Sequence, residues 1–143
     1  MPKVKKKESK NIWNCSKNGD FESVQKYVEK DKAVVNKPDP NGGYTPLQFA
    51  SAYGHLKLVK YLVLNGAELN TKDEDGDTPL HDAAYMGKLD VVKYLVENTA
   101  ADLSLTNKKS FRPYDRAITS GVQPVIDYIY NTKYETERRF RSR

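Results

Sequence analysis

The 143-residue sequence has one cysteine, two histidines and no long apolar stretch. A single cysteine excludes a disulfide bond within the chain and fits a reducing compartment, so we expect a protein of the cytoplasm or the nucleus. The longest apolar runs, such as LKLVKYLVL, contain lysines and fall short of the roughly 20 residues that a membrane span needs. The basic N-terminus, MPKVKKKESK, has no apolar segment behind it, which argues against a secretory signal.

Positive charge is concentrated at the two ends of the chain. Residues 1–10 and 131–143 together hold 10 of the 24 Lys and Arg residues but only 3 of the 19 Asp and Glu residues. A folded nucleic-acid-binding domain usually carries its basic patch on the domain itself, so this distribution argues against that class. The segment PKVKKK resembles a short nuclear-import signal, although a solvated terminus is the simpler explanation.

An internal repeat of about 33 residues organises the chain. The stretch GYTPLQFASAYGHLKLVKYLVLNGA begins at Gly43 and GDTPLHDAAYMGKLDVVKYLVENTA at Gly76, and 14 of their 25 aligned residues are identical. A third copy follows at an offset of 34 residues, and a weaker copy lies upstream at Asn18–Val28. We therefore expect one domain at residues 11–130, with units at about 11–36, 40–72, 73–106 and 107–130, between basic tails at 1–10 and 131–143. The C-terminal tail either extends the last helix, which the i,i+4 spacing of Glu135 and Arg139 supports, or lies outside it.

Each unit has the pattern of two short helices joined by a tight turn and followed by a loop. Thr45 and Thr78 are good N-caps, because a hydroxyl can accept a free N–H of the first turn, and each precedes a proline at the first helical position. Gly54 and Gly87 are expected to end these first helices in a left-handed conformation. The second helix of the 40–72 unit is expected to bury Leu56, Val59, Leu62 and Val63.

A 33-residue helix pair that starts with Thr-Pro-Leu resembles the ankyrin repeat. Residues 78–84, TPLHDAA, carry the Thr-Pro-Leu-His-x-Ala-Ala core of that family, and the resemblance covers about residues 11–130. The outer units depart from the pattern, as terminal caps do: the last has Arg112 in place of the capping Thr. The resemblance implies an all-α solenoid of stacked helix-turn-helix units with projecting β-turn or hairpin loops, similar to small ankyrin-only proteins.

The acidic stretch KDEDGDTPLHDAA at residues 72–84 raises the question of a metal or catalytic site. A calcium loop needs Gly at position 6 and Glu at position 12, but counting from Asp73 the glycine falls at position 4 and position 12 is Ala84. His81 occupies the usual histidine position of the family, where it commonly bonds the neighbouring loop. Two dispersed histidines and one cysteine cannot form a conventional zinc site, and Cys15 aligns with small core residues. We therefore expect no enzyme activity, no metal and no cofactor.

The remaining functional candidate is a surface. In the ankyrin family, partners dock on the turn tips and on the exposed side of the first helices, which form a concave strip. Aromatic residues and Met are also what the core of an interface favours. By register, the expected partner-binding residues are Tyr44, Phe49, Tyr53, Asp75, Asp77, Asp82, Tyr85, Met86, Phe111 and Arg116.

The expected partner of this strip is another protein with an apolar anchor flanked by Lys or Arg, because acidic residues lie at its centre. Asp77 and Asp82 are the favoured contacts for that basic segment. The chain itself is expected to be a monomer with no membrane contact. The alternative is a nuclear or nucleic-acid-associated regulator that acts through the basic tails, although the confinement of charge to the tails argues against direct nucleic-acid binding.

Overall fold

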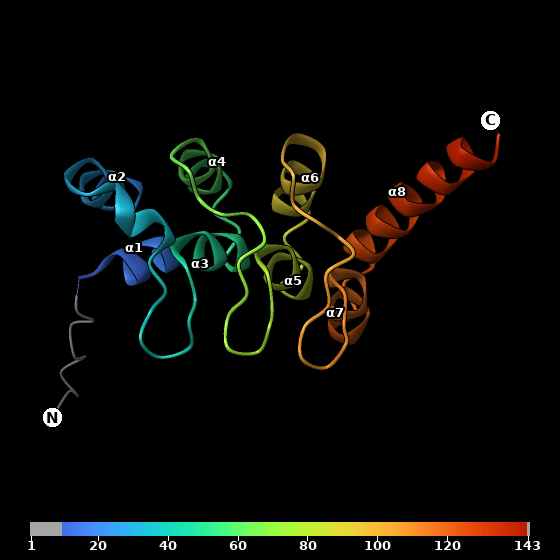
Figure 1. Ribbon diagram of the computed structural model, residues 1–143, viewed down its shortest axis with the longest axis horizontal. Coiled ribbons are helices and arrows are strands. Elements are labelled where there is room, and N and C mark those ends of the chain that lie inside the picture. The colour runs from blue at the N-terminus through green and yellow to red at the C-terminus, as the bar shows by residue number, and fades with distance from the viewer. Residues whose placement is uncertain (1–9, 143) are drawn as a thin grey trace, which may run out of the picture.

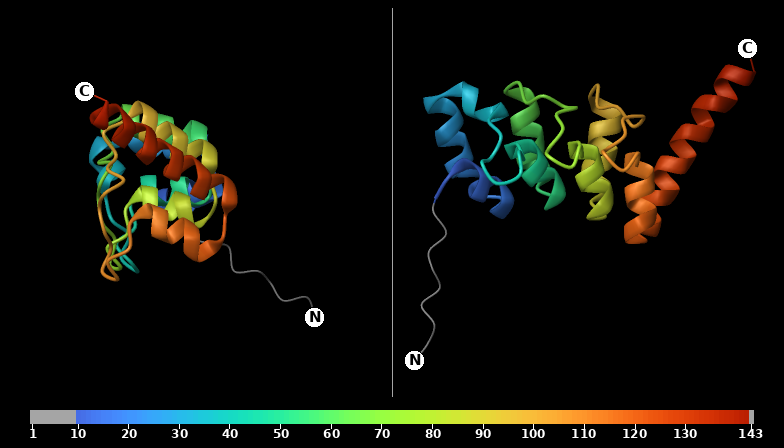
Figure 2. Two further views of the ribbon diagram at one scale, coloured as in Figure 1. Left: turned by 90° about the vertical axis from the view of Figure 1, so that its right-hand side faces the viewer. Right: turned by 60° about the horizontal axis from the view of Figure 1, so that its bottom comes forward.

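The computed structural model describes residues 10–142, and its helices form one row of stacked pairs (Figure 1). The first helices of the pairs form one layer and the second helices form another, while the loops between pairs project beyond the first layer (Figures 1 and 2). The described residues contain no β-strand, and the expected helical solenoid is confirmed. The pairs are α1 (Ile12–Asn18) with α2 (Phe21–Lys30), α3 (Pro46–Ala52) with α4 (Leu56–Leu64), α5 (Pro79–Tyr85) with α6 (Leu89–Asn98), and α7 (Pro113–Ser120) with α8 (Gln123–Arg141), and the short 3-10 helix η1 (Lys32–Asn36) follows α2.

The first helices begin and end where the sequence predicts. The Thr45 hydroxyl accepts a hydrogen bond from the Gln48 N–H at the start of α3, and Thr78 caps α5 in the same way through the residue three positions on. In both helices the side chain of that residue bonds back to the backbone of the cap, which completes a capping box. Gly54 follows α3 at φ 75°, in the left-handed region that favours glycine.

The core runs between the two helix layers along the whole stack. Leu47 and Leu80 of the first helices are fully buried, and so are Val59 and Leu62 of α4, as predicted. Leu56 and Val63 are only half-buried, whereas Leu58 is buried although it was not predicted. The buried side of α4 is rotated in this way because it contacts both α3 of its own pair and α6 of the next. Cys15 lies in the core of the first pair, where burial raises the pKa of its thiol.

The C-terminal segment is part of a helix. Residues 131–141, predicted to form a basic tail that either extends the last helix or lies outside it, continue α8 as far as Arg141 and project away from the stack (Figure 2). Of the predicted N-terminal tail at 1–10, residues 1–9 lie outside the described residues. Among the helices of residues 10–142, none combines the length and the apolar character that a membrane crossing requires.

Each projecting loop is shaped by one side chain that accepts two backbone hydrogen bonds. Asp39 Oδ1 accepts from the N–H groups of residues 42 and 44, and Asp73 Oδ1 from those of residues 75 and 77. Asn107 Oδ1 does the same for residues 109 and 111. These residues lie 34 positions apart, so the carboxylate of Asp73, which could have been a calcium ligand, has a structural role in folding its turn.

One of these turns contains an unfavourable residue. Ser110 has φ 63° and lies where the preceding turn has Gly76 at φ 77°. A side chain in this region costs about 1 kcal/mol, because Cβ approaches the following carbonyl oxygen.

We predict that Ser110→Gly raises the free energy of unfolding by about 0.5–1 kcal/mol, since it removes this cost and loses no contact of the turn backbone. Chemical denaturation measures the change. The matched control is the reverse substitution, Gly76→Ser. It should destabilise the protein because a Cβ at this position would lie 2.9 Å from the backbone nitrogen of Lys108. Equal stabilities of the wild type and Ser110→Gly would contradict the prediction.

Candidate interaction surface

The third residue of each central first helix joins its unit to the next one. His81 Nε2 donates to the Phe111 carbonyl at 2.7 Å, while its Nδ1 accepts from the Thr78 N–H at 3.1 Å. Gln48 makes the same two links one unit earlier: its Nε2 donates to the Asp77 carbonyl at 2.9 Å and its Oε1 accepts from the Thr45 N–H. His81 therefore bonds the neighbouring loop, as expected, and both of its ring nitrogens are occupied.

Three carboxylates gather beneath the first helices, at the junction between these units. Oxygen atoms of Asp73, Asp77 and Asp82 lie within 4.8 Å of one another, and all three residues are buried. Gln48 Nε2 also lies 3.3 Å from Asp73 Oδ2 and 3.2 Å from Asp82 Oδ2. On the other side, Asp77 accepts a hydrogen bond from Asn107 at 2.8 Å and pairs with Arg116 at 3.4 Å.

Burial and, after it, the crowding of like charges raise the pKa of carboxyl groups in this cluster. Burial, followed by repulsion from Asp73 and Asp77, raises the pKa of Asp82 well above its usual value. Burial is also the main reason why the pKa of Asp73 is raised. Next to the cluster, burial and the same carboxylates raise the pKa of Tyr44 to about 12. The carboxylates outnumber the single guanidinium, so the cluster favours a bound proton.

The oxygen atoms of the cluster are close enough to hold a metal ion as a group. However, the donors already present account for their arrangement: two turn amides at Asp73, the amide of Gln48, and the side chains of Asn107 and Arg116 at Asp77. We therefore interpret the cluster as a link between repeats, and that interpretation needs no ion.

The structure divides the ten predicted partner-binding residues into three groups. Tyr53, Tyr85 and Met86 are exposed by 42%, 39% and 43%, and Asp75 is exposed at a turn tip. Tyr44, Phe49, Phe111 and Arg116 are half-buried. Asp77 and Asp82, expected to be the favoured contacts of a basic partner, are only 5% and 9% exposed. Their expected surface position is wrong, because both side chains are used between repeats.

Two cations hold the exposed tyrosines from opposite ends of the strip. Lys17 Nζ lies 5.6 Å from the centre of the Tyr53 ring, and the Arg116 guanidinium lies 4.1 Å from that of Tyr85. Arg116 is thus placed between a ring and Asp77. Ile118 of α7, which is exposed by 51%, was not predicted from the sequence. Its apolar side chain on a first helix was the signal that could have identified it.

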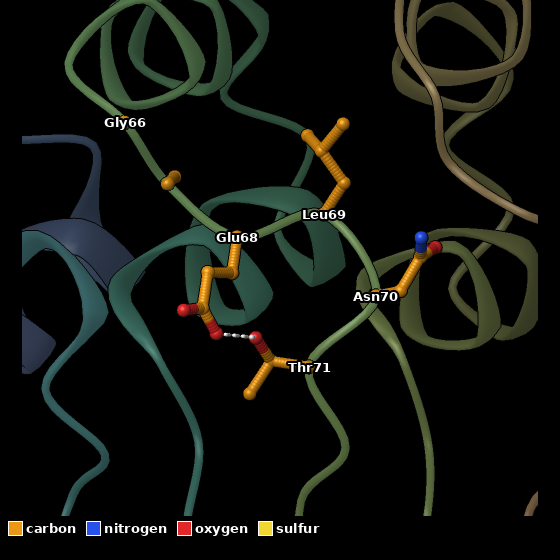
Figure 3. Close-up of a pocket in the computed structure, with 6 residues that line it drawn as sticks. Gly66, Glu68, Leu69, Asn70 and Thr71 are labelled. Atoms are coloured by element: carbon orange, nitrogen blue, oxygen red, sulfur yellow. Dashed lines mark hydrogen bonds between the residues drawn. The ribbon is translucent and has the colours of Figure 1, made fainter.

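A separate hollow lies beside the loop that follows α4 (Figure 3). It has a volume of about 490 Å³ and is lined by Gly66, Ala67, Glu68, Leu69, Asn70 and Thr71. Glu68 is the ionisable side chain among these six and accepts a hydrogen bond from Thr71, so the lining offers no group of catalytic residues. None of the ten predicted partner-binding residues lines it.

Comparison with known proteins agrees with the stacked helix pairs and the capped Thr-Pro starts. The profile of the ankyrin repeat family, in three copies, matches residues 12–107. The chain belongs to the ankyrin repeat family. Ankyrin repeats form protein–protein interaction modules without catalytic function, which is the coarse function of this fold.

Three relatives share part of this ankyrin sequence. An ankyrin repeat-containing protein of Schizosaccharomyces pombe is 36% identical over 47% of this chain and 31% of its own length. The human DNA-binding protein RFXANK is 34% identical over 43% of this chain and 23% of its own length. The mouse ankyrin repeat and SAM domain-containing protein 6 is 35% identical over 76% of this chain and 12% of its own length. The part that matches this chain thus covers less than a third of the length of each of these relatives.

We predict that Asp82→Asn raises the free energy of unfolding at neutral pH by about 1 kcal/mol, the scale of one buried polar interaction. Because the folded state raises the pKa of Asp82, the stability that this group contributes is present at low pH and is lost as the pH rises above about 4, its unfolded value. The neutral amide removes that loss and can still accept from Gln48. Urea denaturation of the wild type and the variant between about pH 4 and pH 8 measures this difference in the free energy of unfolding. A variant that is less stable than the wild type at neutral pH would contradict the interpretation; Asp127→Asn on exposed α8 is the control.

His81 has the opposite pH dependence. Burial lowers its pKa, so its contribution to stability is present above about pH 6.5, the unfolded value, and is lost as the pH falls. Protonation would also place a hydrogen on Nδ1, which accepts from Thr78. We predict that His81→Gln, which copies Gln48, keeps both links and reduces the loss of stability between about pH 6.5 and pH 5. The denaturation midpoints of the wild type and the variant over this pH range measure the loss of stability. Parallel pH profiles of the two proteins would contradict the prediction. His55→Gln is the control.

Proposed function

We propose that this protein binds a partner protein through an inner-helix strip, which we define as Tyr44, Phe49, Tyr53, Tyr85 and Met86. The observation that carries the proposal is the exposure of Tyr53, Tyr85 and Met86 at the ends of two consecutive first helices, α3 and α5. Large apolar side chains that remain exposed side by side on a folded protein are typical of an interaction site. The protein would act as an adaptor or regulator by binding its partner, and it would catalyse no reaction.

The anchors of the strip are held in place before a partner arrives. Tyr44 and Phe49 contact each other with ring centres 5.4 Å apart, and cations from the first and last units lie over Tyr53 and Tyr85. Rings that are already ordered lose little conformational entropy when they are covered. These contacts support the strip as a set of rigid aromatic anchors.

The charge next to the strip supports a partner with a basic residue beside its apolar anchor. Glu74 and Asp75 are exposed at the tip of the turn that precedes α5. Below them, three buried carboxylates face one guanidinium, which leaves an excess of negative charge within that cluster. The proposed contact for the partner's Lys or Arg is therefore this turn tip, and the buried Asp77 and Asp82 contribute only through their field.

The alternative function, a nucleic-acid-associated regulator, has less support. One relative is named a DNA-binding protein, but the match covers 43% of this chain and lies within a longer protein. On α8 the basic residues Arg138 and Arg139 are accompanied by Glu135 and Glu137. We therefore place this alternative second, and propose a cytoplasmic or nuclear location on the sequence grounds given above.

We predict that Tyr53→Ala combined with Tyr85→Ala lowers partner capture at least about tenfold, since an aromatic anchor at an interface contributes on the order of 1–2 kcal/mol. The measurement is quantitative affinity capture from cell extract, with bound proteins identified by mass spectrometry. Leu64→Ala is the matched control: Leu64 is 82% exposed but lies on the second-helix layer. Thermal unfolding of each variant checks the fold.

Two results would overturn the proposal. One is that the same proteins bind the wild type and the double tyrosine variant equally. The other is that Leu64→Ala loses as much binding as the double variant. If the strip binds as proposed, Asp75→Lys should also weaken capture, and the effect should shrink at high salt because this contact is exposed.

A further inference from the structure

The described side chains of the C-terminal half of α8 are exposed. Val125 and Ile129 are buried against the stack, but every side chain described between Lys133 and Arg141 is exposed. Figures 1 and 2 show this half of the helix extending past the last repeat. An isolated helix of about ten residues is only marginally stable in water, so a contact that covers it would stabilise it.

The exposed residues of this segment follow the spacing of a two-helix contact. From Ile126, steps of four, three, four and three residues reach Tyr130, Lys133, Glu137 and Phe140. This alternation places the four side chains on one side of the helix, at the spacing of a two-helix contact, with charged residues at the two inner positions, where they would set the register at a cost in stability. Tyr130 is 46% exposed and Phe140 is 77% exposed, so the seam has an aromatic residue on each side of an oppositely charged pair.

We propose that this seam, Tyr130, Lys133, Glu137 and Phe140, binds a second copy of the same chain in an antiparallel pair of α8 helices. In an antiparallel pair with its two-fold axis level with Glu135, residue 130 lies opposite 140 and residue 133 lies opposite 137. Each aromatic residue then meets the other aromatic, and Lys133 meets Glu137 of the second copy, twice by symmetry. The seam is complementary to itself in charge.

Charge selects this orientation over the parallel one. A parallel pair in register would place Lys133 opposite Lys133 and Glu137 opposite Glu137, which are repulsive contacts. It would also align Arg138, Arg139 and Arg141 with the same residues of the second copy. The antiparallel register instead brings Arg138 and Arg139 level with Thr132 and Asn131. Glu135 is level with Glu135 of the second copy at the two-fold axis, but it lies two residues before Glu137 and therefore on the side of the helix away from the seam.

The contact buries only about three turns of helix, well below the area of a standard stable interface, so the dimer is expected to be weak and to depend on concentration. This dimer replaces the expected monomer and is independent of the proposed partner-binding strip. Its consequence would be two strips in one assembly, which could engage two sites on one partner more tightly than a single strip does.

Sedimentation equilibrium of the full chain from about 10 μM to about 1 mM tests the dimer, since this range brackets weak association. The wild type should shift from monomer toward dimer. Lys133→Glu alone and Glu137→Lys alone should each raise the dissociation constant at least about tenfold, because each replaces two attractive pairs with two repulsive ones. An equimolar mixture of the two variants should recover a heterodimer, since the acidic seam of one variant then faces the basic seam of the other at both charge pairs.

The matched controls change the same charges on the same helix, away from the seam. Glu135→Lys is the control for Glu137→Lys, and Arg139→Glu is the control for Lys133→Glu; both should dimerise like the wild type. A wild type that stays monomeric throughout the range would overturn the proposal, and so would controls that weaken the dimer as much as the seam variants. Single reversals without effect would contradict the antiparallel register, because in a parallel pair they leave the number of repulsive contacts unchanged.

Discussion

The stack depends on a side chain that caps its own helix and also donates a hydrogen bond to the next unit. Gln48 and His81 each accept from the backbone at their helix start and donate to a carbonyl about 30 residues further along the chain. The distance between successive first helices is therefore fixed by a polar link as well as by apolar packing. A first helix of only seven residues would be marginal by itself, and this link ties its N-terminus to a neighbour.

That link explains why acidic residues are buried in a protein with so much polar surface. The donor of Gln48 lies between Asp73 and Asp82, and Asp77 binds Asn107 and Arg116 of the next unit. Taken together, the carboxylates join three consecutive units, but at the cost of charge repulsion. Buried polar networks of this kind contribute more to a defined geometry than to net stability. The opposite pH dependences of Asp82 and His81 are consequences of the same junction.

The helix starts and turns could be predicted from the sequence because they depend on nearby residues. Features that depend on residues far away in the chain could not. Thr45 and Thr78 act on residues three positions away, so their roles can be derived from a short window of sequence. Asp82 was placed on the surface by its register in the first helix of an ankyrin repeat. Its burial follows from Gln48, which lies 34 residues earlier in the chain. Tyr53 and Tyr85 could be placed by register alone. The cations that lie over their rings could not be predicted in this way, because they come from other units.

The basic C-terminus shows how composition can hide structure. Composition placed its Lys and Arg residues in a tail and left open whether that tail is helical, although residues 125–141 contain neither Pro nor Gly and are rich in helix-forming Lys, Arg and Glu. Once α8 is continuous, its charges occupy fixed positions, and Lys133 and Glu137 become one turn apart on a single side with Phe140 beyond them. The same residues that would be non-specific in a disordered tail then define a register. Helix formation thus converts net charge into a pattern that a second helix can recognise.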